Sequence, residues 1–202
     1  MSTLLTPAAI AVMLSLGTHA FAVPYSVANE AELRAALSSG DATTITFTGD
    51  IVVTQGGGGD LPAVQGNVTI DGGGHSLSGD GANRGLFVYG DSNVRIQDLT
   101  IKDTAATGGA GGARAGGGAG LGGGLFVHSD SNVTLSNVTF EDNAANGGDG
   151  GTNSSFDGGG GGLGGDGGQP DETIAGGGGG GVGNQAHGGT GDGSAGGGGI
   201  VT

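Results

Sequence analysis

Acidic and basic side chains recur along this sequence in a pattern that could support sugar chemistry. Carboxylates gathered with a base or an arginine on one outer face of a protein can act as general acid and base on a glycan. The acidic candidates are Asp71, Asp91, Asp98, Asp130 and Asp142, and the basic candidates are Arg84, Arg95, Lys102, His75 and His128. The chain has no cysteine nucleophile, and no Ser-His-Asp set stands out among its serines.

These candidates also have a structural interpretation. Asp91 and Asp130 occupy the same position in two copies of a repeated stretch, and Asp-Ser-Asn is a turn sequence whose side chains bond local backbone. Arg95 is replaced by Thr134 in the second copy, and Lys102 by Glu141, which indicates outward, solvated positions. We therefore predict no catalytic residue, while a glycan lyase or hydrolase remains the alternative.

The sequence contains similarly weak signals for metal and cofactor sites. Residues 161–166 match the first six positions of a calcium-binding nonapeptide repeat, but Gly168 stands where a large apolar residue is required. His75, His128 and His187 lack the short mutual spacing of metal ligands. No helix follows a glycine run, so a phosphate-binding loop is not expected. We predict no metal, no cofactor and no cofactor-binding residue.

An internal repeat predicts the strands that would position any site. Residues 85–106 and 124–145 are identical at 12 of 22 positions, and the two copies lie 39 residues apart. The identities fall on apolar and turn positions, which favours stacking of one copy on the other. The predicted stacks are Phe87 with Phe126, Ile96 with Leu135, Ile101 with Phe140 and Asn93 with Asn132.

Short strands and a single helix precede the repeat. Asn29 and Glu32 have capping-box spacing, and the apolar residues that follow predict a short amphipathic helix to Leu37. Alternating β-branched residues predict strands over 44–48, 51–53 and 67–70. Because equivalent residues match between copies, we predict an all-β fold: a right-handed parallel β-helix (β-solenoid), with a short N-terminal capping helix and long glycine-rich loop insertions.

Composition limits the class of protein. The chain has 202 residues, 54 of them glycine, and a formal charge of −14 from 5 basic and 19 acidic side chains. This charge argues against a nucleic acid or an anionic membrane surface as partner. Glycine is concentrated in 108–124 and 147–199, and we expect flexible, solvent-filled loops there. Residues 1–22 have the apolar run and Ala-Phe-Ala site of a secretory signal peptide, although Lys and Arg are missing before the run.

Several of these features together resemble one family. Residues 70–79, Gly85–Val88 and Val133–Ala145, followed by glycines and preceded by a signal peptide and a helix, are similar to the passenger region of classical autotransporters. The resemblance implies a β-helix displayed on the outer membrane or released outside a Gram-negative bacterium. It also implies a C-terminal membrane β-barrel, and nothing in this sequence resembles one.

We therefore expect the N-terminal fragment of such a passenger. Its predicted parts are a signal peptide (1–22), a β-helix with an N-terminal cap (23–146) and a glycine-rich insertion at about 107–123. A second glycine-rich insertion (147–198) and the start of a further coil (199–202) follow, so the chain is expected to be truncated.

The predicted function is structural and adhesive, without catalysis. The expected partner is a host or neighbouring-cell surface or a glycan, with membrane contact only through the missing barrel. The alternatives are a secreted polysaccharide-active β-helix protein and a free glycine-rich secreted protein that binds ice or matrix. The last would need regular periodicity within the glycine runs, and we find none in 147–199.

Overall fold

A computed structural model describes residues 23–54, 59–152, 160–169, 180–181 and 187–188 of the chain. The predicted signal peptide and the predicted start of a further coil at 199–202 lie outside these residues. The described part is all-β apart from one short helix, and its strands pair in parallel. No helix within this part has the length and apolar character that a membrane span requires.

The helix α1 (Glu30–Ser38) confirms the capping prediction. The Asn29 side chain accepts a hydrogen bond from the Glu32 backbone N–H at 3.0 Å, while the Glu32 carboxylate accepts one from the Ala28 N–H at 2.8 Å. Nine residues are too few for a stable isolated helix. Tertiary packing therefore holds α1 in place, with Leu33 and Ala36 fully buried in the core.

Parallel strands form one large sheet and two small ones. The large sheet orders β1, β2, β4, β7, β5 and β3 side by side, and β10 pairs with the other edge of β7. The small sheets pair β8 with β11 and β6 with β9. The strand bounds are β1 (Val23–Val27), β2 (Ala42–Phe47), β3 (Ile51–Val52), β4 (Asn67–Asp71), β5 (Ser76–Ser78), β6 (Leu86–Val88), β7 (Asn93–Lys102), β8 (Ala105–Thr107), β9 (Leu125–Val127), β10 (Asn132–Glu141) and β11 (Ala144–Asn146).

The chain returns to the same sheet position four times, and we call each passage a rung, beginning at β2, β4, β7 or β10. From β4 to β7 the paired positions advance by 26 residues, as in Asn67 and Asn93. From β7 to β10 they advance by 39, as in Asn93 and Asn132. The extra residues lie between β8 and β9, where the sequence predicted a glycine-rich insertion.

Apolar residues of successive rungs stack in columns inside the sheets. One column contains Ile45, Ile70, Ile96 and Leu135, and another contains Ile51, Leu77, Ile101 and Phe140. The members from the first three rungs are at most 1% exposed. Burying each such side chain contributes roughly 1.5–3 kcal/mol, so these columns are the main source of stability. All four stacks predicted from the repeat are confirmed, including the Phe87 and Phe126 rings at 5.3 Å.

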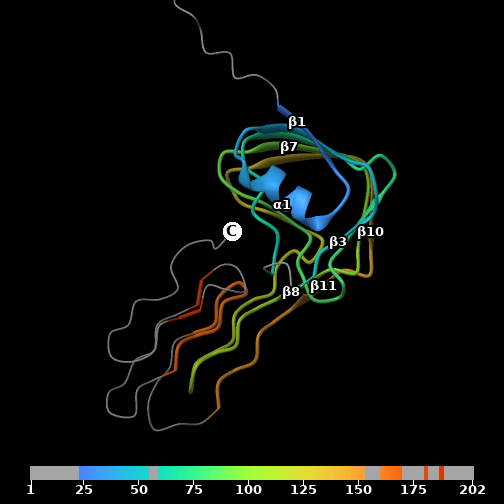
Figure 1. Ribbon diagram of the computed structural model, residues 1–202. Coiled ribbons are helices and arrows are strands. Elements are labelled where there is room, and N and C mark those ends of the chain that lie inside the picture. Colours follow the sequence, from blue (N-terminus) through green and yellow to red (C-terminus); the bar gives the residue numbers. More distant parts are fainter. Residues whose placement is uncertain (1–22, 55–58, 153–159, 170–179, 182–186, 189–202) are drawn as a thin grey trace, which may run out of the picture.

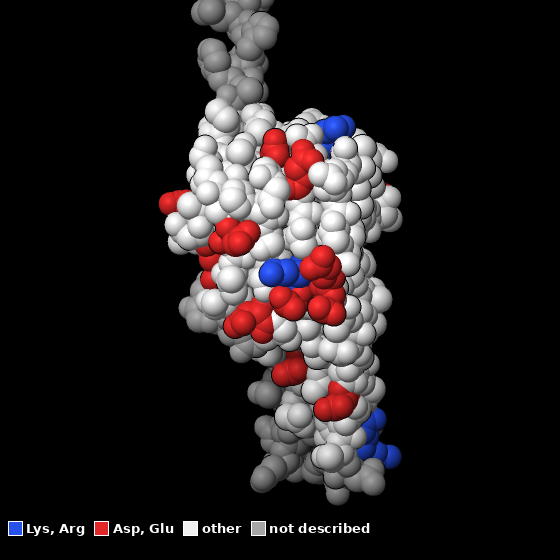
Figure 2. Space-filling view, turned by 90° about the vertical axis from the view of Figure 1, so that its right-hand side faces the viewer, with Lys and Arg blue, Asp and Glu red and all other residues white. Residues whose placement is uncertain are grey.

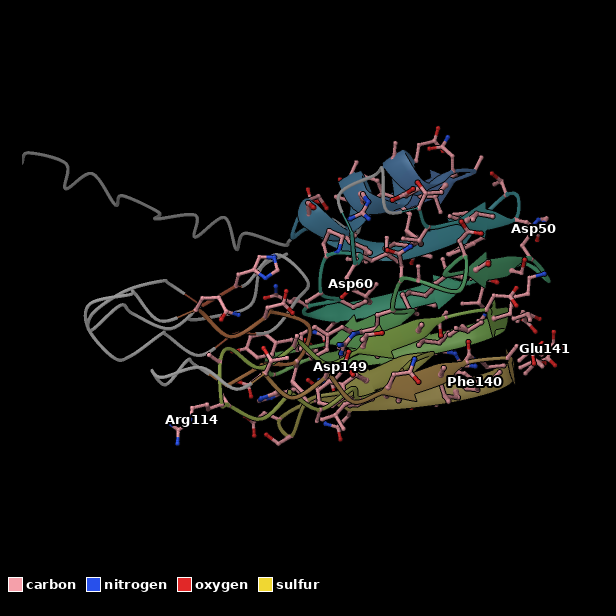
Figure 3. All side chains as sticks on the ribbon, turned by 90° about the horizontal axis from the view of Figure 1, so that it is seen from below. Asp50, Asp60, Arg114, Phe140, Glu141 and Asp149 are labelled. Carbon is pink, nitrogen blue, oxygen red and sulfur yellow. The ribbon has the colours of Figure 1, made fainter. Side chains whose placement is uncertain are left out.

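The arrangement of the stack is clear from two directions. Figure 1 looks along the stack, with α1 lying in front of the enclosed core. Figure 3 views it from the side, with α1 at the top and β10 at the opposite end. The helix therefore closes one end of the core and leaves β10 at the other.

The described glycine segments form an ordered projection, which we call the glycine bundle (residues 108–122, 147–152, 160–169 and 180–181). It extends from the corner near β8 and β11 as neighbouring extended segments (Figure 1). Backbone N–H groups donate to carbonyls of other segments, as from Gly118 to Gly109, Gly148 to Gly118 and Gly161 to Gly116. The prediction of flexible, solvent-filled loops is wrong for these residues, because their backbone groups bond to one another.

The bundle has a period of three residues. Every third N–H group of its first segment donates to every third carbonyl of the chain from the end of β11 onward. These bonds run from Gly108 to Asn146, from Gly111 to Asp149 and from Arg114 to Thr152, at 2.8, 2.8 and 3.2 Å. Polyproline II conformation has three residues per turn and no internal hydrogen bonds, so its backbone groups are available to neighbours. We interpret the bundle as packed polyproline II-type segments.

Candidate functional site

The outward face of β4, β7 and the first half of β10 carries polar side chains in columns. Because side chains alternate across a strand, every second residue of these strands points outward. One column contains Asn67, Asn93 and Asn132, the next contains Thr69, Arg95 and Thr134, and the third contains Asp71, Gln97 and Ser136. The parallel register sets these residues side by side across three rungs, which makes a continuous polar face.

A shallow, open hollow of about 260 Å³ lies between the first two columns. Its lining includes the three asparagines, the two threonines and Arg95, together with Val68 and Val94. The asparagine amides also contact one another, because Asn132 Nδ2 donates to Asn93 Oδ1 at 3.4 Å. The hollow thus crosses the strands and presents amide and hydroxyl groups from several rungs.

Arg95 is held by side chains of the third column. Its Nε donates to Gln97 Oε1 at 2.9 Å, and Gln97 Nε2 donates to Asp71 Oδ2 at 3.0 Å. The other carboxylate oxygen of Asp71 accepts the Gly73 backbone N–H at 3.0 Å. The chain of bonds orients the guanidinium at the rim of the hollow and occupies both oxygens of Asp71.

This arrangement suits binding better than acid–base chemistry. Hydroxyl and amide groups both donate and accept hydrogen bonds, as do the hydroxyls of a sugar. Glycoside hydrolysis requires a pair of carboxyl groups flanking the scissile bond. Among the described residues of the three columns Asp71 is the single carboxylate, and it is already bonded on both oxygens.

Most other acidic candidates are turn residues. The candidates Asp98 and Asp142 have φ angles of 50° and 49°, in the left-handed region that short polar side chains tolerate at tight corners. The equivalent residues of the other copy, Asn137 and Asp103, have φ angles of 53° and 49°. Asp98 also accepts a hydrogen bond from Asn137 of the next rung at 2.7 Å. Asp91 and Asp130 are exposed at the equivalent turns before β7 and β10. These positions support the interpretation of the aspartates as turn residues.

A second group of ionisable residues lies on a different side, at the corner near β3 and β5. Asp50 Oδ1 accepts the Ser76 N–H at 2.8 Å and lies 3.7 Å from His75 Nδ1. The Ser76 backbone N–H, and then the Ser76 hydroxyl, hold the pKa of Asp50 below its usual range, with smaller effects from His75 and Lys102. Figure 2 shows acidic groups gathered on this side with a basic group among them, and Figure 3 places Asp50 and Glu141 there.

Arg84 is a structural residue. Only 4% of it is exposed; its backbone N–H donates to Asp60 Oδ1 at 2.9 Å, and its Nε lies 3.9 Å from Asp60 Oδ2. Burial lowers the pKa of Arg84, and the Asp60 charge opposes that shift. The guanidinium carbon lies 6.0 Å from the centre of the Phe87 ring. Arg84 therefore joins the loop at Asp60 to the core and does not reach the polar face.

The calcium-like stretch belongs to the glycine bundle. Asp166 Oδ1 accepts the Ala110 N–H at 2.7 Å, and its backbone N–H donates to His187 Nδ1 at 3.2 Å. The Asp166 carboxylate thus takes the place of a backbone acceptor in the bundle. No group of three or more His, Cys, Asp or Glu in the described ranges could hold a metal ion. The centres of the His128 ring and of the Tyr89 ring on the preceding rung lie 4.9 Å apart, so the two rings pack against each other.

A further hollow of about 280 Å³ lies where α1 ends. Its lining is apolar or uncharged: Ala36, Leu37, Ser38, Gly40, Ala42, Ile45, Pro62, Ala63, Val64, Gln65, Gly66 and Val68. No charged side chain of the described chain lines it, so it offers little to orient a polar ligand. The polar face is the stronger candidate site.

Two features were missed from the sequence. Gln97 connects Arg95 to Asp71, and the signal was its position two residues after Arg95 on an alternating strand. The period of the glycine bundle is visible as Gly-Gly-X triplets in 108–113 and 147–152. Residues 147–199 were expected to lack regular periodicity, and this expectation is wrong for residues 147–152.

Comparison with known proteins identifies a family for more than half of the chain. Residues 25–148, more than half of the chain, match the family model described as "Putative pectate lyase-like adhesive domain". No curated protein and no solved structure matches the chain. Among the described elements, the match spans α1, the strands from β2 to β11, the last part of β1 and the first glycine segment.

Proposed function

Because the chain belongs to the pectate lyase-like adhesive domain family, we propose that it is an adhesion module that binds glycan-rich surfaces through its polar face. The observation that carries the proposal is the hollow lined by amides, hydroxyls and Arg95 from three rungs. Each sugar hydroxyl needs both a donor and an acceptor nearby, and these columns supply both.

We also propose how the module is built and displayed. The in-register parallel pairing of successive rungs and the right-handed preference of parallel connections support a right-handed parallel β-helix. The adhesive family and the signal-like residues 1–22 support export. The resemblance of the repeats supports display as an autotransporter passenger at the surface of a Gram-negative bacterium.

Binding to an array of immobilised glycans and to intact cells tests the proposed function. Wild type should bind a subset of neutral or weakly acidic glycans, and Arg95→Ala should lower the affinity about tenfold. That change corresponds to roughly 1.4 kcal/mol, the size expected for losing one hydrogen bond to a charged group.

A matched control is available on the same strand. Lys102→Ala removes the same charge from β7, but Lys102 lies beyond the corner and does not line the hollow. Equal losses in the two variants would show that net charge, and not the polar face, governs adhesion. Absence of binding to every glycan and cell type would contradict the proposal.

The second candidate is a polysaccharide lyase or hydrolase. It is favoured only by the network that joins Asp71, Gln97 and Arg95 on one outer face. Incubating the chain with acidic polysaccharides and measuring new reducing ends and unsaturated products tests it. We expect no product above background; product formation that Asp71→Asn abolishes would replace adhesion with catalysis.

A further inference from the structure

The hollow on the polar face has the form of a groove with two walls. Val68 and Val94 line it between the walls, and both are buried, at 6% and 3% exposure, so the floor at these positions is strand backbone. One wall is the asparagine column (Asn67, Asn93 and Asn132), and the other is the threonine–arginine column (Thr69, Arg95 and Thr134).

The two walls fix the direction in which the groove runs. Each wall takes one residue from β4, one from β7 and one from β10, so the groove crosses the strands and follows the stack. Along a strand the walls are two residues apart, which is about 6.6 Å. Across the strands each wall repeats once per rung, at about 4.8 Å. A ligand that lies in the groove therefore meets an amide at every rung.

The asparagine column offers hydrogen-bonding groups to such a ligand. Its three members are exposed. Asn132 Nδ2 donates to Asn93 Oδ1 at 3.4 Å, which uses one donor and one lone pair. An amide group has two N–H donors and two acceptor lone pairs, so each of these amides retains at least one donor and one acceptor. Contact between neighbouring amides also orders them in advance, which favours binding.

The charge of the groove favours an uncharged ligand. Arg95 is the one charged side chain among the lining residues of the groove, and Gln97 joins it to the carboxylate of Asp71. The whole chain has a formal charge of −14. A polyanionic ligand would therefore meet a single cation in the groove and a strongly negative molecule around it.

Linear polysaccharides differ in whether they can follow a straight groove. In a β-1,4-linked chain of glucose-type rings, both glycosidic bonds leave each ring equatorially, so the chain is extended and its hydroxyls project from both edges. An α-1,4-linked chain of the same rings has one axial bond per ring and curves into a helix. The length of one ring in the extended chain is close to the strand spacing of about 4.8 Å. Of the two, the extended chain can place one ring on each rung.

We propose that the groove binds a linear, neutral, β-1,4-linked polysaccharide that lies along the stack, with one sugar ring on each rung. The inference rests on the proposed function, because it names the ligand of the same polar face. Hydroxyls on one edge of the chain bond to the asparagine column, and those on the other edge bond to the threonine–arginine column. The rungs of β4, β7 and β10 thus hold three consecutive rings.

Isothermal titration calorimetry with oligosaccharides of increasing length is the first test. The probes are β-1,4-linked series of glucose, mannose and N-acetylglucosamine, each from one ring to six, with the α-1,4-linked glucose series as the linkage control. For at least one β-1,4-linked series, affinity should rise about tenfold per ring from one ring to three, because each ring gains hydrogen bonds on a further rung. The α-1,4-linked glucose trimer should bind at least about tenfold more weakly than the best β-1,4-linked trimer.

Two asparagine variants test the direction of the chain. Any two adjacent rungs of the groove include β7, so Asn93→Ala should lower affinity for two-ring and three-ring ligands alike, by about tenfold. Asn67→Ala should lower affinity for the three-ring ligand about tenfold, and for the two-ring ligand only about twofold, since one of its two positions is kept. Thr139→Ala is the matched control and should bind like wild type, because Thr139 is an exposed residue of β10 that does not line the groove.

Three outcomes would overturn the inference. Equal affinity for one ring and for three would mean that a single sugar fills the site. An Asn67→Ala protein that binds three-ring ligands as tightly as wild type would mean that the chain does not cross the rungs. Equal binding of α-1,4-linked and β-1,4-linked trimers would mean that the groove does not select an extended chain. Circular dichroism of each variant shows whether the fold is kept, so loss of structure is not mistaken for loss of binding.

The same measurements separate this inference from the proposed function. The protein could bind branched or terminal sugars on the glycan array, through a site that Arg95→Ala weakens, and bind none of the β-1,4-linked series. Adhesion through the polar face would then stand, and the linear ligand would be wrong. A protein that binds no glycan at all contradicts both.

Discussion

The stack of rungs and the glycine bundle bury their interiors by opposite means. In the stack, apolar side chains such as Ile70 and Ile96 fill the space between sheets, and the parallel strands bond through regular ladders. In the bundle, side chains are almost absent and backbones pack directly on one another. A Cβ added at Gly109 or Gly151 would lie 1.8 or 1.7 Å from a carbonyl oxygen of another segment.

The difference shows what each region depends on. The stack gains free energy from apolar area removed from water, so it tolerates polar changes on its outer face. The bundle gains little from apolar burial and relies on hydrogen bonds and on the absence of Cβ atoms. Glycine also loses more conformational freedom on folding than any other residue, so the bundle should be the less stable region. Four predictions test this contrast, from the largest expected effect to the smallest.

Ile96→Ala should have the largest effect. Ile96 is fully buried in the third rung, between Ile70 and Leu135. Truncation of a buried isoleucine costs about 2–5 kcal/mol of unfolding free energy, from lost transfer energy and from the cavity. Urea denaturation followed by circular dichroism measures it. Thr139→Ala on the exposed side of β10 serves as the control and should shift stability by less than about 0.5 kcal/mol.

Gly151→Ala should disrupt the bundle and leave the stack intact. Its Cβ would meet the Gly112 oxygen at 1.7 Å, and its N–H donates to Ala115 at 2.9 Å. We expect faster amide exchange in the bundle, equivalent to a local loss of about 1–3 kcal/mol. Hydrogen–deuterium exchange with mass spectrometry resolves the two regions.

The neighbouring glycine provides the control for that experiment. A Cβ at Gly150 would come no closer than 3.9 Å to its nearest neighbour, the Ala115 oxygen. Gly150→Ala should therefore leave amide exchange in the bundle unchanged. If the two alanine variants behave alike, the close backbone packing of the bundle is incorrect.

Acid should weaken the α1 end of the stack through Glu30. Burial works to raise the pKa of Glu30, but hydrogen bonds from Arg34 and Thr54 outweigh it and lower the pKa below 4.5. A lowered folded-state pKa gives stability that is present above the unfolded pKa and is lost as pH falls through the folded value. Stability of wild type should therefore fall below about pH 4.5.

Glu30→Gln isolates this contribution. The variant should be less stable than wild type at neutral pH, and the difference should shrink as pH falls below 4.5. Asp41 and Asp50 keep their own pKa shifts in both proteins, so their contributions cancel in the comparison. Parallel pH profiles for the two proteins would rule out a role for Glu30.

Arg95→Ala should have the smallest effect on stability. Arg95 is exposed on the outer face, and an isolated surface substitution usually changes unfolding free energy by less than about 0.5 kcal/mol. Thermal unfolding should thus be unchanged while glycan binding falls. A large loss of stability would mean that the columns of the polar face support the stack and are not a free binding surface.

Much of the stack could be predicted from the repeat alone. Matching Phe87 with Phe126 and Asn93 with Asn132 identified the register, because stacked rungs require the same residue type at the same position. The Asn29 cap and the helix that follows were also predictable, since capping depends on residues three positions apart. These features rest on local patterns or on direct comparison of two copies.

The candidate site could be predicted only in part. The sequence indicated outward positions for Arg95 and Thr134, but the connection of Arg95 to Asp71 through Gln97 depends on the pairing of separate rungs. Arg84 was a basic candidate like Arg95, and only packing against Asp60 and Phe87 revealed that it is buried. Local sequence does not distinguish a buried arginine from an exposed one when both lie near turns.

The sequence by itself thus determined the parallel stack, its register and its capped end, because apolar periodicity and repeated turns have few physical solutions. Only the tertiary structure decided the glycine bundle and the exposure of β10 within the described residues. Glycine has no side chain whose type could indicate its neighbours, so the bundle is identified only when backbones as far as 57 residues apart, such as those of Gly167 and Ala110, bond to one another. Leu135 and Phe140 have the residue types of core positions, and they are 44% exposed because β10 is the last rung in the part of the chain that the structure describes.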